Sequence, residues 1–291
     1  MKKFIYLIIP LIFFASLEFC LRYLGFGNPV IYSISENNNY YPKSKQENVR
    51  YKGAKIKINQ LGMRTNSDWS DFSNKKKIIF FGDSVTYGGS YIDNKDLFSQ
   101  KVCDDFFRNT LCGNYGVNGY NIQNIHLRIE DIDKKYYDKI IILVSSEIKN
   151  SFSHFNNFPF YKKFDYFFFR ASFEILNHFM FKYKIYNTYH DKWSENLTPK
   201  TENKQNSFKK LLNSIADDKE VIIFILPTME DLMNMNKKNN ILELLTFEKI
   251  QTINLFDNIL QSNYKNLYFN NAHLNKKGHE HIAKIIYDYI K

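Results

Sequence analysis

A short apolar strand that ends abruptly in small and polar residues is the feature that most constrains this chain. Residues 75–88 read KKKIIFFGDSVTYG, so a basic lead-in runs into apolar residues and then into Gly82, Asp83 and Ser84. A serine directly after a buried strand is how α/β enzymes present a nucleophile at the carboxyl edge of a sheet. The alternative is an ordinary turn in which Ser84 caps a helix. Asp83 is expected to fix the turn rather than to take part in chemistry.

A histidine near the other end of the chain offers the base that such a serine needs. Residues 268–281 read YFNNAHLNKKGHEH, which places His273 on a loop after a short strand and just ahead of the last helix. Histidine is the usual partner because its pKa lies near neutrality. The chain has seven histidines, and this context is what singles out His273.

Three blocks in this order resemble the SGNH, or GDSL-type, hydrolases. They are the GDSVTYG stretch, the glycine block NYGVNGY at 114–120, and the terminal histidine. The resemblance implies that Ser84 is the nucleophile of acyl transfer and His273 its base. It also maps the family's oxyanion glycine to Gly116. The stretches at 18–32, 59–64 and 226–230 resemble a membrane-anchored bacterial branch of the same family.

The aspartate that the family carries three residues before the histidine falls on Asn270. An amide can hold an imidazole, but it does not stabilise imidazolium as a carboxylate does, and it can favour the wrong tautomer. The resemblance leaves other orienters open, since some members use a backbone carbonyl. A different acid, such as Glu147, is a further candidate.

The third block of the family is also altered. After the apolar run at 140–144 the chain reads SSEIKN, with no glycine and no Asn-Asp pair. The expected oxyanion hole combines the backbone N–H groups of Ser84 and Gly116 with the side chain of Asn150. The alternative for Asn150 is a polar residue that merely starts a helix.

Strand-like and helix-like segments alternate along the rest of the chain. This order predicts an α/β fold, a three-layer sandwich around a central parallel sheet of about five strands. We expect no cofactor and no metal, because neither a glycine-rich phosphate loop nor a zinc-type cysteine spacing occurs. Strands are expected at 77–81, 111–115, 139–144, 220–226 and 266–269, and helices at 96–109, 122–134, 208–216, 239–258 and 276–290.

The amino-terminal part predicts a separate module. Two lysines precede the apolar run FIYLIIPLIFFASL, which continues to about residue 26. We expect residues 1–26 to form an uncleaved transmembrane anchor with the remaining chain on the extracytoplasmic, periplasmic side. A cleaved signal peptide is the main alternative, but no small-residue cleavage site follows the run. Residues 27–74 are expected to be an extended leader that packs on the domain formed by 75–291.

Residues 151–205 interrupt this domain with a run dense in Phe and Tyr, interleaved with Lys and Arg. Three interpretations stand: a lid that shapes an acyl or sugar pocket, a surface that rests on a membrane interface, and helices that pack aromatic faces onto the core. The last is favoured, because aromatic stripes usually belong to cores.

Net charge and cysteine content limit the kinds of partner and compartment to be expected. The net charge of +10 favours anionic surfaces such as lipid headgroups or acidic glycans. No nucleic-acid-binding signature appears, so no nucleic-acid partner is expected. Cys103 and Cys112 are either bridged in an oxidising compartment or free, half-buried thiols. The oligomeric state is not indicated by the sequence.

These observations predict a serine esterase or acyl transferase that acts on ester-linked acyl groups, chiefly O-acetyl groups, of an envelope polysaccharide. Its activity is expected to be reduced by Asn270. The alternative is a non-catalytic glycan-binding or assembly protein on a decayed hydrolase fold. A lipase or thioesterase acting at the bilayer is a third, weaker interpretation.

Overall fold

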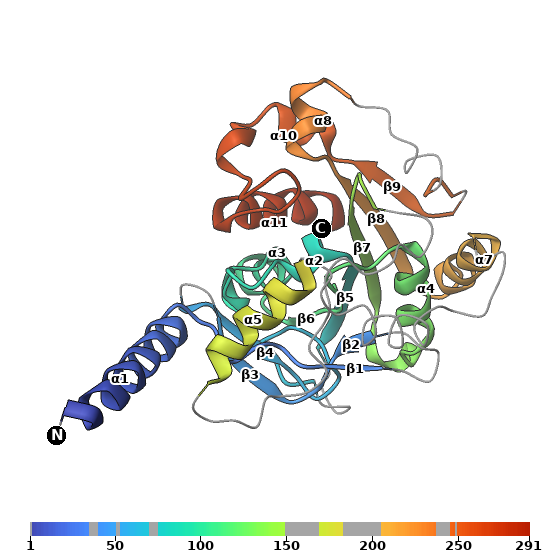
Figure 1. Cartoon of the computed structure of the whole chain (residues 1–291). Coiled ribbons are helices and arrows are strands. Elements are labelled where there is room, and N and C mark those ends of the chain that lie inside the picture. The colour runs from blue at the N-terminus through green and yellow to red at the C-terminus, as the bar shows by residue number, and fades with distance from the viewer. Residues whose placement is uncertain are drawn as a thin grey trace.

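The centre of the molecule is a five-stranded sheet (Figure 1). The strands stand in the order β6-β5-β7-β8-β9, and every neighbouring pair is parallel. Their bounds are β5 Lys76–Gly82, β6 Thr110–Asn114, β7 Lys139–Ser145, β8 Glu220–Leu226 and β9 Gln251–Asn254. The predicted central parallel sheet of about five strands is therefore confirmed. The computed structural model describes residues 2–34, 40–50, 53–69, 75–148, 169–182, 205–236, 245–247 and 249–291.

Helices cover both faces of the sheet, because alternate strand residues point to opposite sides. Ile78 and Phe80 of β5 belong to one buried cluster, and Ile79 and Phe81 belong to the other. The first cluster lies against α2 (Ser84–Tyr87), α3 (Phe98–Lys101), α10 (Phe256–Leu260) and α11 (Lys276–Ile290). The second lies against α4 (Ile122–Glu130) and α7 (Gln205–Ala216). Two cores on the two faces of one sheet make the three layers (Figure 1).

The fifth strand is not where the sequence predicted it. Residues 251–254 form β9, although they fall within the helix predicted at 239–258. The strand predicted at 266–269 is wrong. Part of it lies in η5 (Tyr264–Asn266), and Tyr268 makes only an isolated antiparallel bridge to Leu274. A four-residue edge strand with one buried side chain carries too little periodicity to be told from a helix end.

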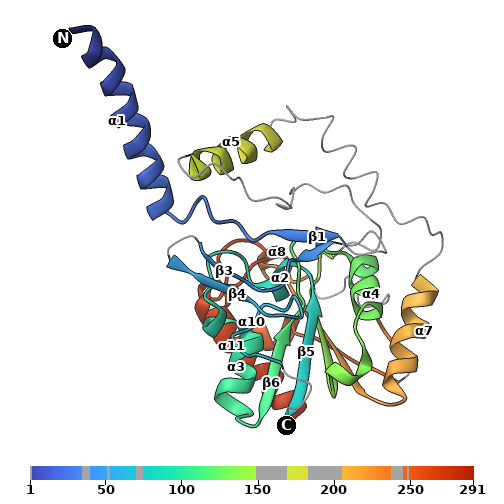
Figure 2. The same cartoon turned by 90° about the horizontal axis from the view of Figure 1, so that it is seen from below.

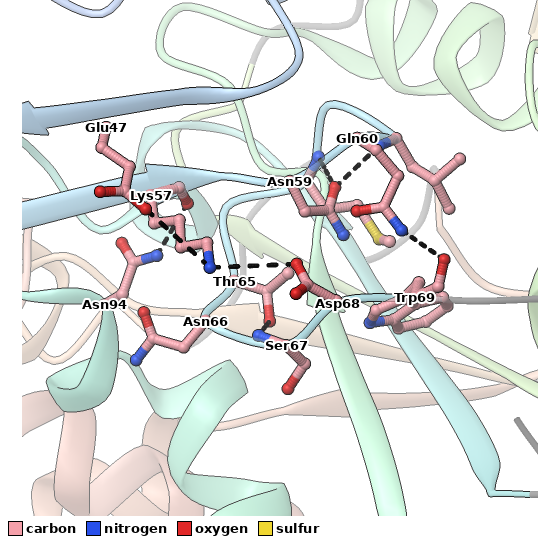
Figure 3. A network of polar contacts seen from close by, with 12 residues as sticks. Glu47, Lys57, Asn59, Gln60, Thr65, Asn66, Ser67, Asp68, Trp69 and Asn94 are labelled. Carbon is pink, nitrogen blue, oxygen red and sulfur yellow. Dashed lines mark hydrogen bonds and ion pairs between the residues drawn. The ribbon is translucent and has the colours of Figure 1, made fainter.

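The leader between α1 (Lys2–Tyr23) and β5 contains two antiparallel strand pairs rather than a plain extended segment. Figure 3 shows the polar contacts that fold its second half. Asn59 Oδ1 accepts from the N–H groups of Leu61 and Met63, both at 3.0 Å, and closes a tight turn in which Gly62 has a φ of 77°. This turn directs the side chain of Arg64 into the interior. The strands are β1 Tyr32–Ile34, β2 Tyr40–Pro42, β3 Gln46–Val49 and β4 Lys55–Ile58.

Helix α5 (Arg170–Lys182) lies beside α1, which projects from the molecule in both views (Figures 1 and 2). Glu18 of α1 caps α5 by accepting from Ala171 N and Ser172 N, each at 3.0 Å. Buried Glu174 of α5 accepts from Arg50 Nη2 at 2.6 Å. The rest of the aromatic insertion predicted at 151–205 falls mostly outside the described residues.

Among the helices in the described part of the chain, none is both long enough and apolar enough to cross a membrane. The transmembrane anchor predicted at 1–26 is therefore not confirmed. The side chains of residues 1–7 lie outside the described set.

Cys103 and Cys112 form a disulfide, which selects one of the two alternatives that the sequence left open. The bridge joins η3, a π-helical segment at Val102–Phe106, to β6. It therefore fixes the layer of α3 to one edge of the sheet.

Replacing both Cys103 and Cys112 by alanine is expected to lower the free energy of unfolding by about 2–3 kcal/mol, because the bridge closes a short loop in the unfolded chain. Urea unfolding of the oxidised protein measures this change. Cys20→Ala is the matched control, since Cys20 is an exposed free thiol and its removal should leave the midpoint unchanged. Equal midpoints for all three proteins would contradict the expectation.

Candidate active site

Ser84 stands at the carboxyl edge of the sheet, at the first residue of α2. The chain adds β6 on one side of β5 and then β7 on the other side, so the strand order reverses between β5 and β7. Crevices form at such reversal points in open parallel sheets. Gly82 is required at the end of β5, because a Cβ there would collide with Leu143 O and the Thr86 side chain. The sequence thus delivers a serine to the place where α/β sheets bind ligands.

Asp83 locks this turn to the neighbouring strand. Its Oδ1 accepts from Val85 N at 3.0 Å as the N-cap of α2, and its Oδ2 accepts from Ser145 N at 3.2 Å. Burial raises the pKa of Asp83 to about 6, so the carboxylate is charged at neutral pH. Both oxygens face backbone N–H groups, which explains why an aspartate rather than an asparagine stands here. This arrangement agrees with the structural role expected for Asp83.

His273 reaches the serine from a loop 189 residues further along the chain, with Nε2 2.8 Å from Ser84 Oγ. The loop closes on itself through the Tyr268–Leu274 bridge and through Phe269 N, which donates to His273 O at 2.8 Å. Asn275 then caps α11 by accepting from Gly278 N. A tight loop directly before a helix therefore holds the imidazole against the Ser84 hydroxyl.

Asn270 orients the other side of the imidazole, and the surrounding donors decide which atom of its amide does so. The backbone N–H groups of Ala272 and His273 point at the amide atom that faces the ring, at 3.1 and 2.9 Å. Two N–H donors can meet only an acceptor, so this atom is Oδ1. His273 Nδ1 lies 3.0 Å from the same oxygen.

This geometry sets the tautomer of His273. Since Asn270 Oδ1 can only accept, Nδ1 carries the proton and Nε2 is left with a lone pair for the Ser84 hydroxyl. An amide in this position thus does not impose the unproductive tautomer that the sequence left open. It still provides no negative charge to stabilise imidazolium. Burial lowers the pKa of His273, so the ring is neutral and able to accept a proton at pH 7.

Glu147, the other candidate orienter, does not meet the imidazole. Its Oε1 accepts from Asn271 Nδ2 at 3.3 Å. The Asn271 carbonyl accepts from Met229 N at 2.7 Å, at the start of α8 (Met229–Met233). Glu147 and Asn271 therefore tie the histidine loop to its neighbours.

The oxyanion hole expected from Ser84, Gly116 and Asn150 stays a prediction. In the structure the Gly116 N–H donates to Asn114 Oδ1 at 2.8 Å, so it would have to leave this acceptor to meet an oxyanion. A Cβ at Gly116 would collide with the backbone of Tyr87 and Thr86, which makes close packing on α2 the reason for a glycine here. Asn150 lies outside the described residues. The Ser84 amide, at the start of a helix where N–H groups lack an intrahelical partner, remains as a candidate donor.

Asn114 is a site residue that sequence reasoning missed. Besides accepting from Gly116 N, it donates through Nδ2 to Thr86 O at 2.6 Å and to Ser99 Oγ at 3.0 Å. It therefore fixes the end of β6 to the helix that carries the nucleophile. The available signal was an asparagine at the carboxyl end of a predicted strand, where the glycine block begins. In the described part of the chain no group of three or more metal-ligating side chains comes together.

No protein-family model and no curated protein matches the sequence. Several solved structures resemble the fold, among them the following three. A lipolytic protein of the G-D-S-L family from Veillonella parvula is 16% identical, with a TM-score of 0.42, over 74% of this chain and 98% of that one. The lipase/acylhydrolase from Enterococcus faecalis is 13% identical, with a TM-score of 0.43, over 74% and 95%.

A two-domain esterase active on acetylated mannans is 14% identical, with a TM-score of 0.45. The match covers 76% of this chain but only 50% of that one. At such TM-scores and identities these likenesses do not bear on function, which has to be argued from the site.

Asn270→Asp is expected to raise kcat by about tenfold, because a charge-assisted hydrogen bond replaces a neutral one on the forming imidazolium. Asn270→Ala is expected to lower kcat by roughly 100-fold, because it frees the ring and removes the acceptor of two backbone N–H groups. Initial rates on p-nitrophenyl acetate measure both. Equal rates for the three proteins would contradict the assigned role.

The pH dependence of kcat/KM is expected to differ between the wild-type protein and Asn270→Asp. His273 acts as a base only when neutral, so kcat/KM rises with pH, and the lowered pKa places the midpoint of this rise below pH 6.5. In Asn270→Asp the added negative charge favours imidazolium and moves the rise to higher pH. A rise that stays at the same pH in both proteins would show that position 270 does not touch the ring in solution.

Proposed function

We propose that this chain is a serine ester hydrolase or acyl transferase in which Ser84 is the nucleophile and His273 the base. The observation that carries the proposal is the hydrogen-bonded series Ser84 Oγ, His273 Nε2, His273 Nδ1 and Asn270 Oδ1, with links of 2.8 and 3.0 Å. A nucleophile, a base and an orienter in this geometry are what acyl transfer needs.

The reaction proceeds in two halves. Ser84 Oγ attacks the ester carbonyl while His273 Nε2 takes its proton, and the tetrahedral intermediate collapses when the leaving alcohol recovers that proton. The acyl group is now bound to Ser84. Water or a sugar hydroxyl then gives its proton to Nε2 and attacks the acyl-enzyme. Nε2 returns this proton to Ser84 Oγ as the acid or the acylated sugar is released.

The substrate we propose is an O-acylated, chiefly O-acetylated, envelope polysaccharide. This step rests on the sequence resemblance to a branch of hydrolases that modifies envelope glycans. Esterase and acyl transferase use the same residues, and the acceptor alone separates them. Release of free acetate would indicate hydrolysis, and acetate retained on added oligosaccharide would indicate transfer.

A decayed, non-catalytic fold is the weaker candidate. Asn270 was its main support, and the side-chain oxygen of Asn270 occupies the position that holds the productive tautomer. The alternative predicts binding of oligosaccharide without consumption.

We further propose that the domain is extracytoplasmic and is held at a membrane through residues 1–26. Two observations support this. The Cys103–Cys112 disulfide favours an oxidising compartment. On α1, large apolar side chains face solvent, with Leu11 68% and Phe19 74% exposed, which is costly unless a lipid phase covers them.

Ser84→Ala is expected to abolish turnover of p-nitrophenyl acetate above background and to prevent labelling by a fluorophosphonate probe. The reason is that the acyl-enzyme cannot form without Oγ. Ser90→Ala is the matched control, a serine on the following loop that should keep both signals. Full activity in Ser84→Ala would remove Ser84 from the mechanism.

The double substitution Leu11→Glu and Phe13→Glu is expected to move the protein from the membrane fraction to the soluble fraction, because charged side chains oppose burial in lipid. Fractionation followed by immunoblotting measures the distribution. Met233→Glu with Met235→Glu is the control. These residues are also exposed and apolar, but they lie at the end of α8 and just after it rather than on α1. Identical distributions for both double variants would refute the attachment through α1.

A further inference from the structure

The two reacting side chains come from segments that no strand pairing joins. Ser84 leads α2, which ends at Tyr87, and Gly88 and Gly89 then turn the chain with φ values of 87° and 69°. His273 lies on the loop before α11. Because a misplacement of about 1 Å can cost roughly 100-fold in rate, something has to fix the two segments against each other.

Tyr91 makes contacts on both sides of His273. Its ring stacks on Phe269, with 4.1 Å between centroids and 21° between planes. Its hydroxyl donates to Leu274 O at 3.1 Å. Phe269 also donates its backbone N–H to His273 O at 2.8 Å. The loop that follows the nucleophile thus holds the loop of the base at residues just before and just after the imidazole.

A buried arginine sets the segment that carries Tyr91. Arg64 is 1% exposed, and its guanidinium donates to the carbonyls of Tyr87 at 2.7 Å, Gly89 at 2.6 Å and Ile92. Its Nε donates to Asn94 Oδ1 at 3.0 Å. One planar, rigid group therefore holds two carbonyls that precede Tyr91 and one that follows it.

The leader positions this arginine in turn. Asn94 Nδ2 donates to Lys57 O at 2.8 Å, next to the Asn59 turn (Figure 3). Arg64 N donates to Asn114 O at 2.8 Å. In the described residues no carboxylate forms an ion pair with Arg64. The cost of burying this charge is offset by neutral oxygen acceptors and by the Tyr87 ring, whose centroid lies 4.7 Å from Arg64 Cζ.

We infer that Tyr91, set by Arg64, is a positioning residue that holds His273 in hydrogen-bonding reach of Ser84. The inference deepens the proposed function and rests on it. Tyr91 does not touch the reacting atoms and acts through the backbone around the imidazole. It compensates for a base whose orienter is an uncharged amide, because an amide restrains the ring less strongly than a carboxylate does.

The test compares Tyr91→Leu, which removes the stack and the hydrogen bond, with Tyr91→Phe, which keeps the stack. Tyr287→Leu is the matched control, because Tyr287 stacks on Phe106 at 4.5 Å in another part of the molecule. Two quantities are measured on the full chain: the pKa of His273, by NMR titration of its ring proton, and kcat and KM on p-nitrophenyl acetate.

For Tyr91→Leu we expect kcat to fall by roughly 10- to 100-fold with KM within about twofold. We also expect the pKa of His273 to rise toward its ordinary value, because the loosened loop admits water to the ring. Tyr91→Phe should keep most of kcat, and Tyr287→Leu should change neither quantity.

Two results would overturn the inference. One is an unchanged His273 pKa and kcat in Tyr91→Leu. The other is a raised KM at constant kcat, which would make the Tyr91–Phe269 pair a substrate-binding surface. The titration does not depend on turnover. A wild-type protein that shows the lowered pKa, reversed in Tyr91→Leu, but cleaves no ester would sustain the positioning role and refute the proposed function.

Discussion

The parallel pairing of β5 with a strand on each side is the constraint on which the site depends. This pairing makes β5 a central strand, whose apolar residues are buried on both faces of the sheet. The chain leaves β5 at the carboxyl edge of the sheet. Gly82 makes the exit sharp, and Asp83 joins the new turn to the end of β7. Ser84 lies where the strand order reverses between β5 and β7, and the other parts of the site are arranged around that point.

Asn270 shows that the atom which faces the ring matters more than the residue type. Two backbone N–H groups force the amide oxygen toward His273, and that oxygen selects the tautomer in which Nε2 can accept a proton. What the amide lacks is charge. The site therefore has the hydrogen-bond geometry that the proposed acyl transfer requires but lacks a negative charge beside the imidazole. Other contacts that restrain the imidazole gain importance for this reason.

The sequence predicts the features that depend on local pattern. Long apolar runs and caps are strong signals. They made it possible to recognise the strand that precedes Ser84, three further sheet strands and the final helix. Features that depend on tertiary contacts were not. The edge strand β9 was too short to be distinguished from a helix. The oxyanion role mapped to Gly116 stays a prediction, and in the structure its N–H donates to the nearby Asn114 Oδ1. The stacking of Tyr91 on Phe269 links two segments far apart in the chain, which no periodicity encodes.

The distance of 189 residues between Ser84 and His273 has a consequence for the order of folding. The turn that carries Ser84 and four of the five sheet strands, β5 to β8, precede residue 227, whereas the imidazole arrives only when the loop of His273 and α11 dock. Contacts of such long sequence separation form late, since loop closure costs entropy before it is compensated. A nascent chain thus holds Ser84 without its hydrogen bond to His273 until the segment that carries His273 and α11 has emerged.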